Sequence, residues 1–268
     1  MAHIAAKVKC FALGFMARML TLSEGIIPVM KRLLEKCPMT QKAYLCSQHV
    51  QHISKLRREG LFQKLYCRSL ADSARIQGSF CGYRNIQMLI SYIVNAKSEG
   101  ANKFGDTFPS IFTIQDMIEN AWDNGFNPEG RIETGGIRGT RKYIGTPEAF
   151  REKEAGRSGR MLFGAIESYF KGGVGNEVAN QKSKVSLTTL PPIYLQHQGH
   201  SMTIVGFEKM SNGKDTLLVF DPSFRDTPAA RELVGHTVRC PDHKAESILQ
   251  QYRRDSKYVR KYSEFEVL

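Results

Sequence analysis

A β-rich stretch at residues 193–221 reads IYLQHQGHSMTIVGFEKMSNGKDTLLVFD. Its three runs at residues 193–196, 201–209 and 216–221 are typical of strands. Asn212-Gly213 separates the second run from the third and is a strong signal for a hairpin turn. Because helical patterns dominate the chain before this stretch, we predict an α+β fold in which an antiparallel sheet packs against helices.

Helical periodicity describes the chain upstream of the sheet. Apolar residues recur at helical spacing over residues 26–34, Pro38 marks a stop, and a second helical segment is expected from Thr40. We therefore interpret residues 1–58 as a helical N-terminal region. Residues 59–79 are basic and weakly patterned, and we interpret them as an insertion at the surface.

A further helix is expected directly after Cys81. Ile86, Leu89, Ile90 and Ile93 form the apolar stripe of a helix that packs on a core. Cys81 is therefore expected at the N-terminus of this helix.

Two more helices are expected, over residues 114–122 and 160–170. Gly125 and Pro128 are expected to end the first of them, and the glycine-rich residues 131–147 are interpreted as a loop. The basic and aromatic run at residues 252–262 is interpreted as the solvated face of a helix.

Length and composition describe an ordinary globular chain. It has 268 residues, of which 41% are hydrophobic and 24% charged, enough for one sizeable core. The formal net charge of +12 favours polyanions, but no arginine-rich or aromatic RNA-binding signature accompanies it, so nucleic acid is not expected as the main partner. No apolar stretch approaches the roughly 20 residues of a membrane-spanning helix, so no membrane partner is expected.

The six cysteines are widely spread, which is typical of a reduced protein of the cytoplasm or nucleus. Cys240 with His243, and His197 with His200, have the spacing of half a zinc site. Neither has a second pair to complete a metal tetrahedron, so no metal is expected.

Cys81 is a candidate nucleophile because the positive end of a helix dipole lowers the pKa of a thiol. The glycine at position 82 lets the backbone approach a substrate closely. This pattern alone still favours an inert core cysteine over a nucleophile.

His200 and Asp221 are candidates for the base and for the group that orients it. They lie at the outer ends of the two strands that the Asn212-Gly213 turn joins. A strict two-residue turn would place Asp221 opposite Ile204, roughly 13 Å along the strand from His200. A longer turn or a β-bulge is needed to bring the two side chains together.

Two further side chains lie on the strand that enters this corner. An amide at Gln196 is suited to donate to an oxyanion, with a structural hydrogen bond as the alternative. His197 is expected on the opposite strand face, as a packing or surface histidine.

Three segments resemble the zinc-finger-containing ubiquitin peptidase branch of the family of proteases specific for ubiquitin-fold modifier, which are papain-like cysteine peptidases. They are FCGYRNIQML at residues 80–89, IQDMIENAWDNGFNPEG at residues 114–130 with YIGTPE at residues 143–148, and PPIYLQHQGHSMTIVGFE at residues 191–208, leading into LLVFDP.

The resemblance implies a papain-like catalytic domain over residues 80–268 and assigns roles within it. It implies that Cys81 is the nucleophile, His200 the base and Asp221 the residue that orients the base, while Gln196 supports the oxyanion. No cofactor is implied. The implied activity is deubiquitination, which is hydrolysis of isopeptide bonds in ubiquitin conjugates or polyubiquitin chains.

The modifier is inferred from one motif. Proteases for ubiquitin-fold modifier resemble each other in an Asp-Pro-His motif with a catalytic histidine, whereas this chain has Asp221-Pro222-Ser223. The resemblance therefore favours ubiquitin as the partner, with ubiquitin-fold modifier as the alternative. Asp116, Glu119 and Asp123 share one helix face and are expected to receive the basic tail of ubiquitin, unless they form a solvated face.

The chain departs from the family pattern in three places. Zinc fingers are absent, so residues 1–58 would supply any additional ubiquitin-binding surface. Residues 61–78 interrupt a junction that is short in compact relatives, and a charged run replaces an apolar segment after Phe150. These changes leave a catalytically inactive ubiquitin-binding homologue as a further alternative.

Overall fold

The computed structural model describes residues 25–54, 80–104, 108–145, 157–175, 183–235, 242–262 and 264–268. The expected insertion at residues 59–79 and the charged run through residue 156 lie outside the described residues.

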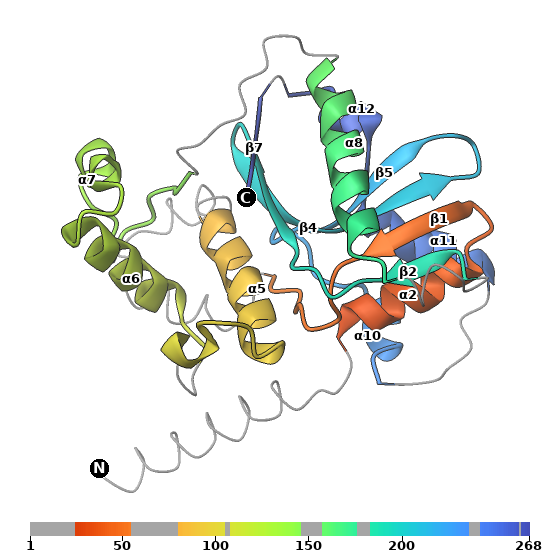
Figure 1. Ribbon diagram of the computed structural model, residues 1–268, viewed down its shortest axis with the longest axis horizontal. Coiled ribbons are helices and arrows are strands. Elements are labelled where there is room, and N and C mark those ends of the chain that lie inside the picture. Colours follow the sequence, from red (N-terminus) through yellow and green to blue (C-terminus); the bar gives the residue numbers. More distant parts are fainter. Residues whose placement is uncertain are drawn as a thin grey trace, which may run out of the picture.

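A sheet of seven strands organises the described part of the chain (Figure 1). The long strand β4 (His200–Met210) pairs with β3 (Ile193–His197) and β1 (Thr40–Leu45) along successive halves of one edge, and with β5 (Asp215–Phe220) along the other. The outer strands are β2 (Val185–Leu187), β6 (Arg253–Asp255) and β7 (Phe265–Val267). The α+β prediction is confirmed, although β1 and β2 pair in parallel within the otherwise antiparallel sheet.

Strand β1 corrects the prediction of a helical segment from Thr40. Ala43, Tyr44 and Leu45 are buried, and β1 pairs with the second half of β4. A short buried run of this kind has no periodicity that separates a strand from a helix, and pairing with β4 decides between them. Because β1 belongs to the same sheet as the candidate site residues, residues 25–54, the described part of the expected N-terminal region, are not a separate helical unit.

Helices cover the sheet and form one main core with it. Helix α2 (Ile26–Lys36) packs against β1, β2 and α11 (Asp242–Leu249), and α8 (Arg157–Gly172) packs against β1, β4 and β5. Residues 201–208 of β4 are all buried, as expected for a strand covered on both faces. The apolar periodicity over residues 26–34 correctly predicted α2.

Helix α5 (Cys81–Asn95) lies between this core and a smaller helical lobe. Met88 packs into the sheet core, whereas Tyr83 and Ile90 pack with α6 (Ile111–Asp123). Figure 1 shows α6 and α7 (Pro128–Thr134) on the side of α5 away from the sheet. The N-terminus of α5 therefore lies where the two parts of the fold meet.

Two interpretations of local sequence were wrong. Pro128 does not end α6; it begins α7, because proline suits the first turn of a helix, and α7 occupies residues that were expected to be loop. The run at residues 252–262 is not one solvated helix. It forms part of η2 (Gln250–Tyr252), then β6 and α12 (Ser256–Val259), and Arg254 is buried.

Candidate active site

Cys81 is the first residue of α5, and its side chain is buried. The preceding residue, Phe80, makes no side-chain cap, so the first N–H groups of the helix keep no such partner. The thiol therefore lies at the positive end of a fifteen-residue helix. The prediction that Cys81 begins this helix is confirmed.

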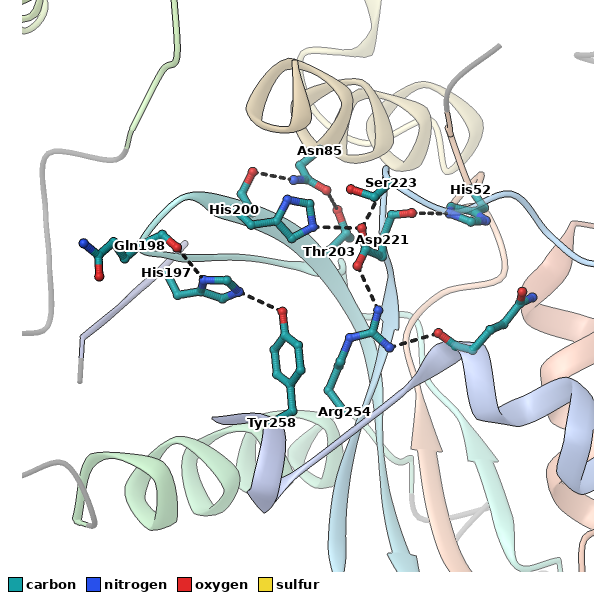
Figure 2. Close-up of polar contacts among 12 residues, drawn as sticks. His52, Asn85, His197, Gln198, His200, Thr203, Asp221, Ser223, Arg254 and Tyr258 are labelled. Carbon is teal, nitrogen blue, oxygen red and sulfur yellow. Dashed lines mark hydrogen bonds and ion pairs between the residues drawn. The ribbon is translucent and has the colours of Figure 1, made fainter. Parts of the chain in front are cut away.

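Two features of the β4–β5 hairpin bring His200 close to Asp221: a turn longer than two residues and a β-bulge in β4. Met210 and Lys214 close a turn of three residues, and a bulge between Ile204 and Gly206 shifts the register again. Phe220 consequently pairs with Thr203, and His200 Nε2 lies 2.8 Å from Asp221 Oδ1 (Figure 2). The sequence required a longer turn or a bulge, and the structure has both.

His200 also interacts with the Cys81 thiol. Burial by itself raises the pKa of the thiol, but hydrogen bonds with the His200 side chain and with Ser201 outweigh it, and the pKa of Cys81 lies below its ordinary value. Burial opposes the charged imidazole, but Asp221 and Cys81 together raise the pKa of His200 to about 9. Each group thus favours the charged form of the other, which is the arrangement of a thiolate beside an imidazolium.

Asn85 links α5 to β4 by side-chain hydrogen bonds. Asn85 Nδ2 donates to Ser201 Oγ at 2.9 Å, and Thr203 Oγ1 donates to Asn85 Oδ1 at 2.8 Å (Figure 2). The side chain of Asn85 is fully buried. These bonds fix the start of α5 relative to the strand that carries His200.

Asp221 is held on both of its oxygens. Oδ1 accepts from His200 and from the backbone N–H of Ser223, and Oδ2 accepts from Arg254 Nη2 at 2.8 Å (Figure 2). Although burial opposes the carboxylate, these partners lower the pKa of Asp221. Arg254 could not be found from the sequence, because no motif connects it to Asp221. Arg254 lies near Asp221 because β6 pairs with β5.

Gln196 lies on β3 with its amide held on both sides. Tyr194 donates from its hydroxyl to Gln196 Oε1 at 2.7 Å, and Gln196 Nε2 donates to Glu266 at 3.0 Å. The second N–H of this amide is the one that an oxyanion can use. Glu266 comes from β7, a strand that the sequence reading did not predict.

Residues 143–145 lie against the start of α5. A Cβ atom at Gly82 would lie 2.9 Å from Ile144 Cγ1 and 3.3 Å from the Tyr194 hydroxyl. Burial, with Cys81 as a further cause, raises the pKa of Tyr194 to about 12 and also that of Tyr143. Both tyrosines are therefore protonated donors near the thiol, and neither was identified from the sequence.

His197 packs beside the site, as the sequence predicted. Its ring stacks on Tyr262 with centroids 3.6 Å apart, and its Nε2 lies 2.8 Å from the Tyr258 hydroxyl. Burial lowers the pKa of His197, which favours the neutral ring.

The three carboxylates expected to receive a basic tail already have internal partners. Glu119 is buried and accepts from the backbone N–H groups of Ile137 and Arg138, which lower its pKa, so its assignment as a substrate contact is corrected. Asp116 pairs with Arg138 at 2.7 Å, and Asp123 pairs with Arg131 at 2.7 Å. These pairs hold α7 and the loop that follows it onto α6.

Within the described ranges, no three His, Cys, Asp or Glu side chains are grouped to hold a metal ion. No helix there is both long enough and apolar enough to cross a membrane.

Residues 40–268 match the model of Peptidase family C78. The chain belongs to this family. As a C78 peptidase it has the papain-like arrangement of a cysteine at a helix N-terminus facing a histidine on a sheet, and the fold predicted from the sequence is confirmed.

Named relatives of this C78 chain match it over parts of their length. The zinc finger-containing ubiquitin peptidase 1 of Homo sapiens is 30% identical over 248 residues, 86% of this chain and 36% of that protein, and the Mus musculus protein is 34% identical over 65% of this chain and 30% of its own length. The ubiquitin carboxyl-terminal hydrolase mug105 of Schizosaccharomyces pombe is 33% identical over 54% of this chain and 60% of its own length. This chain thus spans about a third of the length of the zinc-finger relatives. The structure of UfSP from C. elegans aligns with a TM-score of 0.39 at 13% identity, covering 72% of this chain and 29% of that one.

Proposed function

We propose that this C78 peptidase is a deubiquitinase that hydrolyses the isopeptide bond between the C-terminal glycine of ubiquitin and a lysine. The observation that carries the proposal is the hydrogen bond between His200 and Asp221 beside Cys81 at the N-terminus of α5, where Cys81 and His200 shift the pKa of each other. The names of the relatives as a ubiquitin peptidase and a ubiquitin carboxyl-terminal hydrolase supply the modifier.

The proposed reaction assigns one step to each group. The Cys81 thiolate attacks the glycine carbonyl, and the oxyanion that forms accepts hydrogen bonds from the Cys81 N–H and the free N–H of Gln196. His200 gives its proton to the lysine amine as the C–N bond breaks, leaving a thioester on Cys81. His200 then takes a proton from water, whose oxygen attacks the thioester and releases ubiquitin and the thiolate.

The hydrogen bonds of Asp221 support ubiquitin over ubiquitin-fold modifier. In the branch with an Asp-Pro-His motif, the residue two positions after the aspartate is the catalytic histidine. Here that residue is Ser223, whose backbone N–H binds Asp221 Oδ1 at 2.9 Å, and the histidine that contacts Asp221 comes from β4 instead. A histidine on β4 that contacts Asp221 fits the arrangement that the resemblance implies for the ubiquitin branch, and this supports ubiquitin as the modifier.

The test is covalent labelling with two probes, ubiquitin and ubiquitin-fold modifier, each bearing a C-terminal electrophile. We expect the ubiquitin probe to label the protein, Cys81→Ala to abolish the label, and Cys46→Ala to retain it, because burial raises the pKa of the Cys46 thiol. Labelling by the other probe alone would transfer the proposal to ubiquitin-fold modifier. A folded sample that reacts with neither would favour the inactive ubiquitin-binding homologue.

A further inference from the structure

A groove with a volume of about 910 Å³ adjoins the candidate active site. His200 and Asp221 line one end of it, and Lys214 at the tip of the β4–β5 hairpin lines the other. At about 3.3 Å per residue the ten-residue step from His200 to Met210 along β4 spans roughly 30 Å, the length of an extended peptide of about ten residues. We propose that this groove binds an acidic segment of the protein that carries the scissile lysine, an inference that rests on the proposed deubiquitinase function.

The groove adjoins His200, and this position favours the lysine-bearing protein over ubiquitin as its occupant. His200 protonates the leaving amine, so the polypeptide that carries the amine emerges on the side of His200 away from the acyl group. The groove begins at His200, whereas Cys81 and Gln196, which hold the acyl group, are not among its lining residues. The groove therefore meets the site at His200 and Asp221 and is separate from the groups that hold the acyl group.

The positive charge of the groove favours an acidic occupant. Lys214, Lys257 and Lys261 line it, are exposed, and form no ion pair with any described residue. The two carboxylates that line it are both engaged: Asp221 by His200 and Arg254, and Asp255 by the backbone N–H of Tyr258. The lysine ammonium groups are thus left to pair with carboxylates from outside the chain.

The aromatic rings of the groove favour an acidic peptide over single-stranded nucleic acid, which binds by stacking bases on free rings. The ring of Tyr262 is stacked on His197, and the ring of Tyr258 has the Arg254 guanidinium at 5.2 Å and Lys261 Nζ at 5.7 Å. Of the aromatic side chains that line the groove, Phe224 alone is largely exposed, and the guanidinium of Arg254 lies 5.7 Å from its ring. Little ring surface remains for bases.

The kinetic test compares two isopeptide conjugates of ubiquitin. Each carries a ten-residue fluorescent peptide on the lysine side, one with glutamates around the lysine and the other with glutamines. We expect wild-type kcat/KM to be about fivefold higher for the glutamate conjugate at low salt, and the ratio to approach one as salt screens the charges. Lys257→Glu with Lys261→Glu is expected to bring the ratio to one or below. The charge-matched control, Lys103→Glu with Lys171→Glu, changes exposed lysines outside the groove and is expected to keep the wild-type ratio.

Hydrolysis of ubiquitin bearing a C-terminal aminocoumarin separates the two proposals. If that substrate is cleaved and the wild-type ratio is one, the groove proposal is overturned while the proposed function stands. If it is not cleaved, the proposed function fails, and anisotropy with the free glutamate and glutamine peptides on Cys81→Ala protein decides the groove separately. Equal binding of the two peptides would overturn the groove proposal. It would also be overturned if a single-stranded oligonucleotide bound more tightly than the peptides and the Lys257→Glu and Lys261→Glu changes abolished that binding.

Discussion

Arg254 donates from Nη2 to Oδ2 of Asp221 at 2.8 Å, on the carboxylate oxygen that His200 does not use. The guanidinium is buried and also donates to the backbone carbonyls of Gln251 and Arg253, which fix its plane. Arg254 is therefore a positioning residue for the aspartate that orients His200.

We predict that Arg254→Met lowers kcat about tenfold or more with little change in KM, because a hydrogen bond to a charged group is worth about 1.5–3 kcal/mol. Arg254→Lys should restore part of the loss. The rate of Cys81 alkylation by iodoacetamide, measured near pH 6.5 on folded protein, should fall in parallel. An alkylation rate equal to that of the exposed control Arg260→Met would show that Arg254 supports the fold alone.

The coupled pKa shifts predict the pH range of activity. Because the pKa of Cys81 is lowered and that of His200 is raised to about 9, the thiolate–imidazolium pair exists between the two values. Activity should rise with pH as the thiol loses its proton and fall as pH passes about 9, when the imidazolium loses its own.

Asp221→Asn provides the check on that assignment. Removing the carboxylate removes a cause of the raised His200 pKa, so the alkaline limb should move toward lower pH. The measurement is kcat/KM across both limbs for both proteins. An alkaline limb that stays in place would mean that a group other than His200 controls it.

Close packing at Gly82 predicts a steric defect. A Cβ atom there would lie 2.9 Å from Ile144 Cγ1 and 3.2 Å from the Ile144 carbonyl oxygen, so residues 143–145 must shift. Because displacements of about 1 Å at a reacting centre can cost about a hundredfold, we expect Gly82→Ala to lower kcat/KM tenfold or more. Gly164→Ala on α8, where a Cβ atom meets nothing within 4 Å, is the control and should stabilise the protein by about 0.5–1 kcal/mol. Equal activity of the two variants would contradict the steric argument.

The role proposed for Gln196 predicts a change in kcat. Removing one oxyanion donor typically lowers kcat by a factor of about 100 or more, so Gln196→Ala should fall in this range with KM nearly unchanged. Tyr194→Phe, which frees the amide from its hydroxyl partner, should have a smaller effect in the same direction. Steady-state kinetics test both, with the exposed Gln198→Ala as control. A full-rate Gln196→Ala enzyme would reduce this residue to a structural hydrogen bond.

The internal bonds of Glu119 predict a loss of stability. Its carboxylate holds the backbone N–H groups of Ile137 and Arg138, so Glu119→Ala should lower the free energy of unfolding by about 1–3 kcal/mol. Asp123→Ala, which removes a half-exposed ion pair, should cost less than about 1 kcal/mol. Urea denaturation compares the two, and equal losses would argue against the anchoring role of Glu119.

Much of the site could be predicted from the sequence because its information is local or carried by motifs. The helix after Cys81, the strands of the β4–β5 hairpin and its turn all follow from periodicity and turn chemistry. The need for a bulge or a longer turn followed from counting residues between His200 and Asp221. The roles of Cys81 as nucleophile, His200 as base and Asp221 as the orienting group are predictions that the labelling and kinetic experiments test.

Only the tertiary structure decided which distant segments complete the site. Arg254 and Glu266 reach Asp221 and Gln196 because β6 and β7 pair with β5 and β3, and strand pairing between distant segments leaves no periodic signal in either. The same limit explains the error at β1, where pairing with β4 overrode an ambiguous local pattern. It also explains why Asp116, Glu119 and Asp123 were read as free carboxylates: a helix face is visible in the sequence, but the arginines and backbone N–H groups that fold back onto it are not.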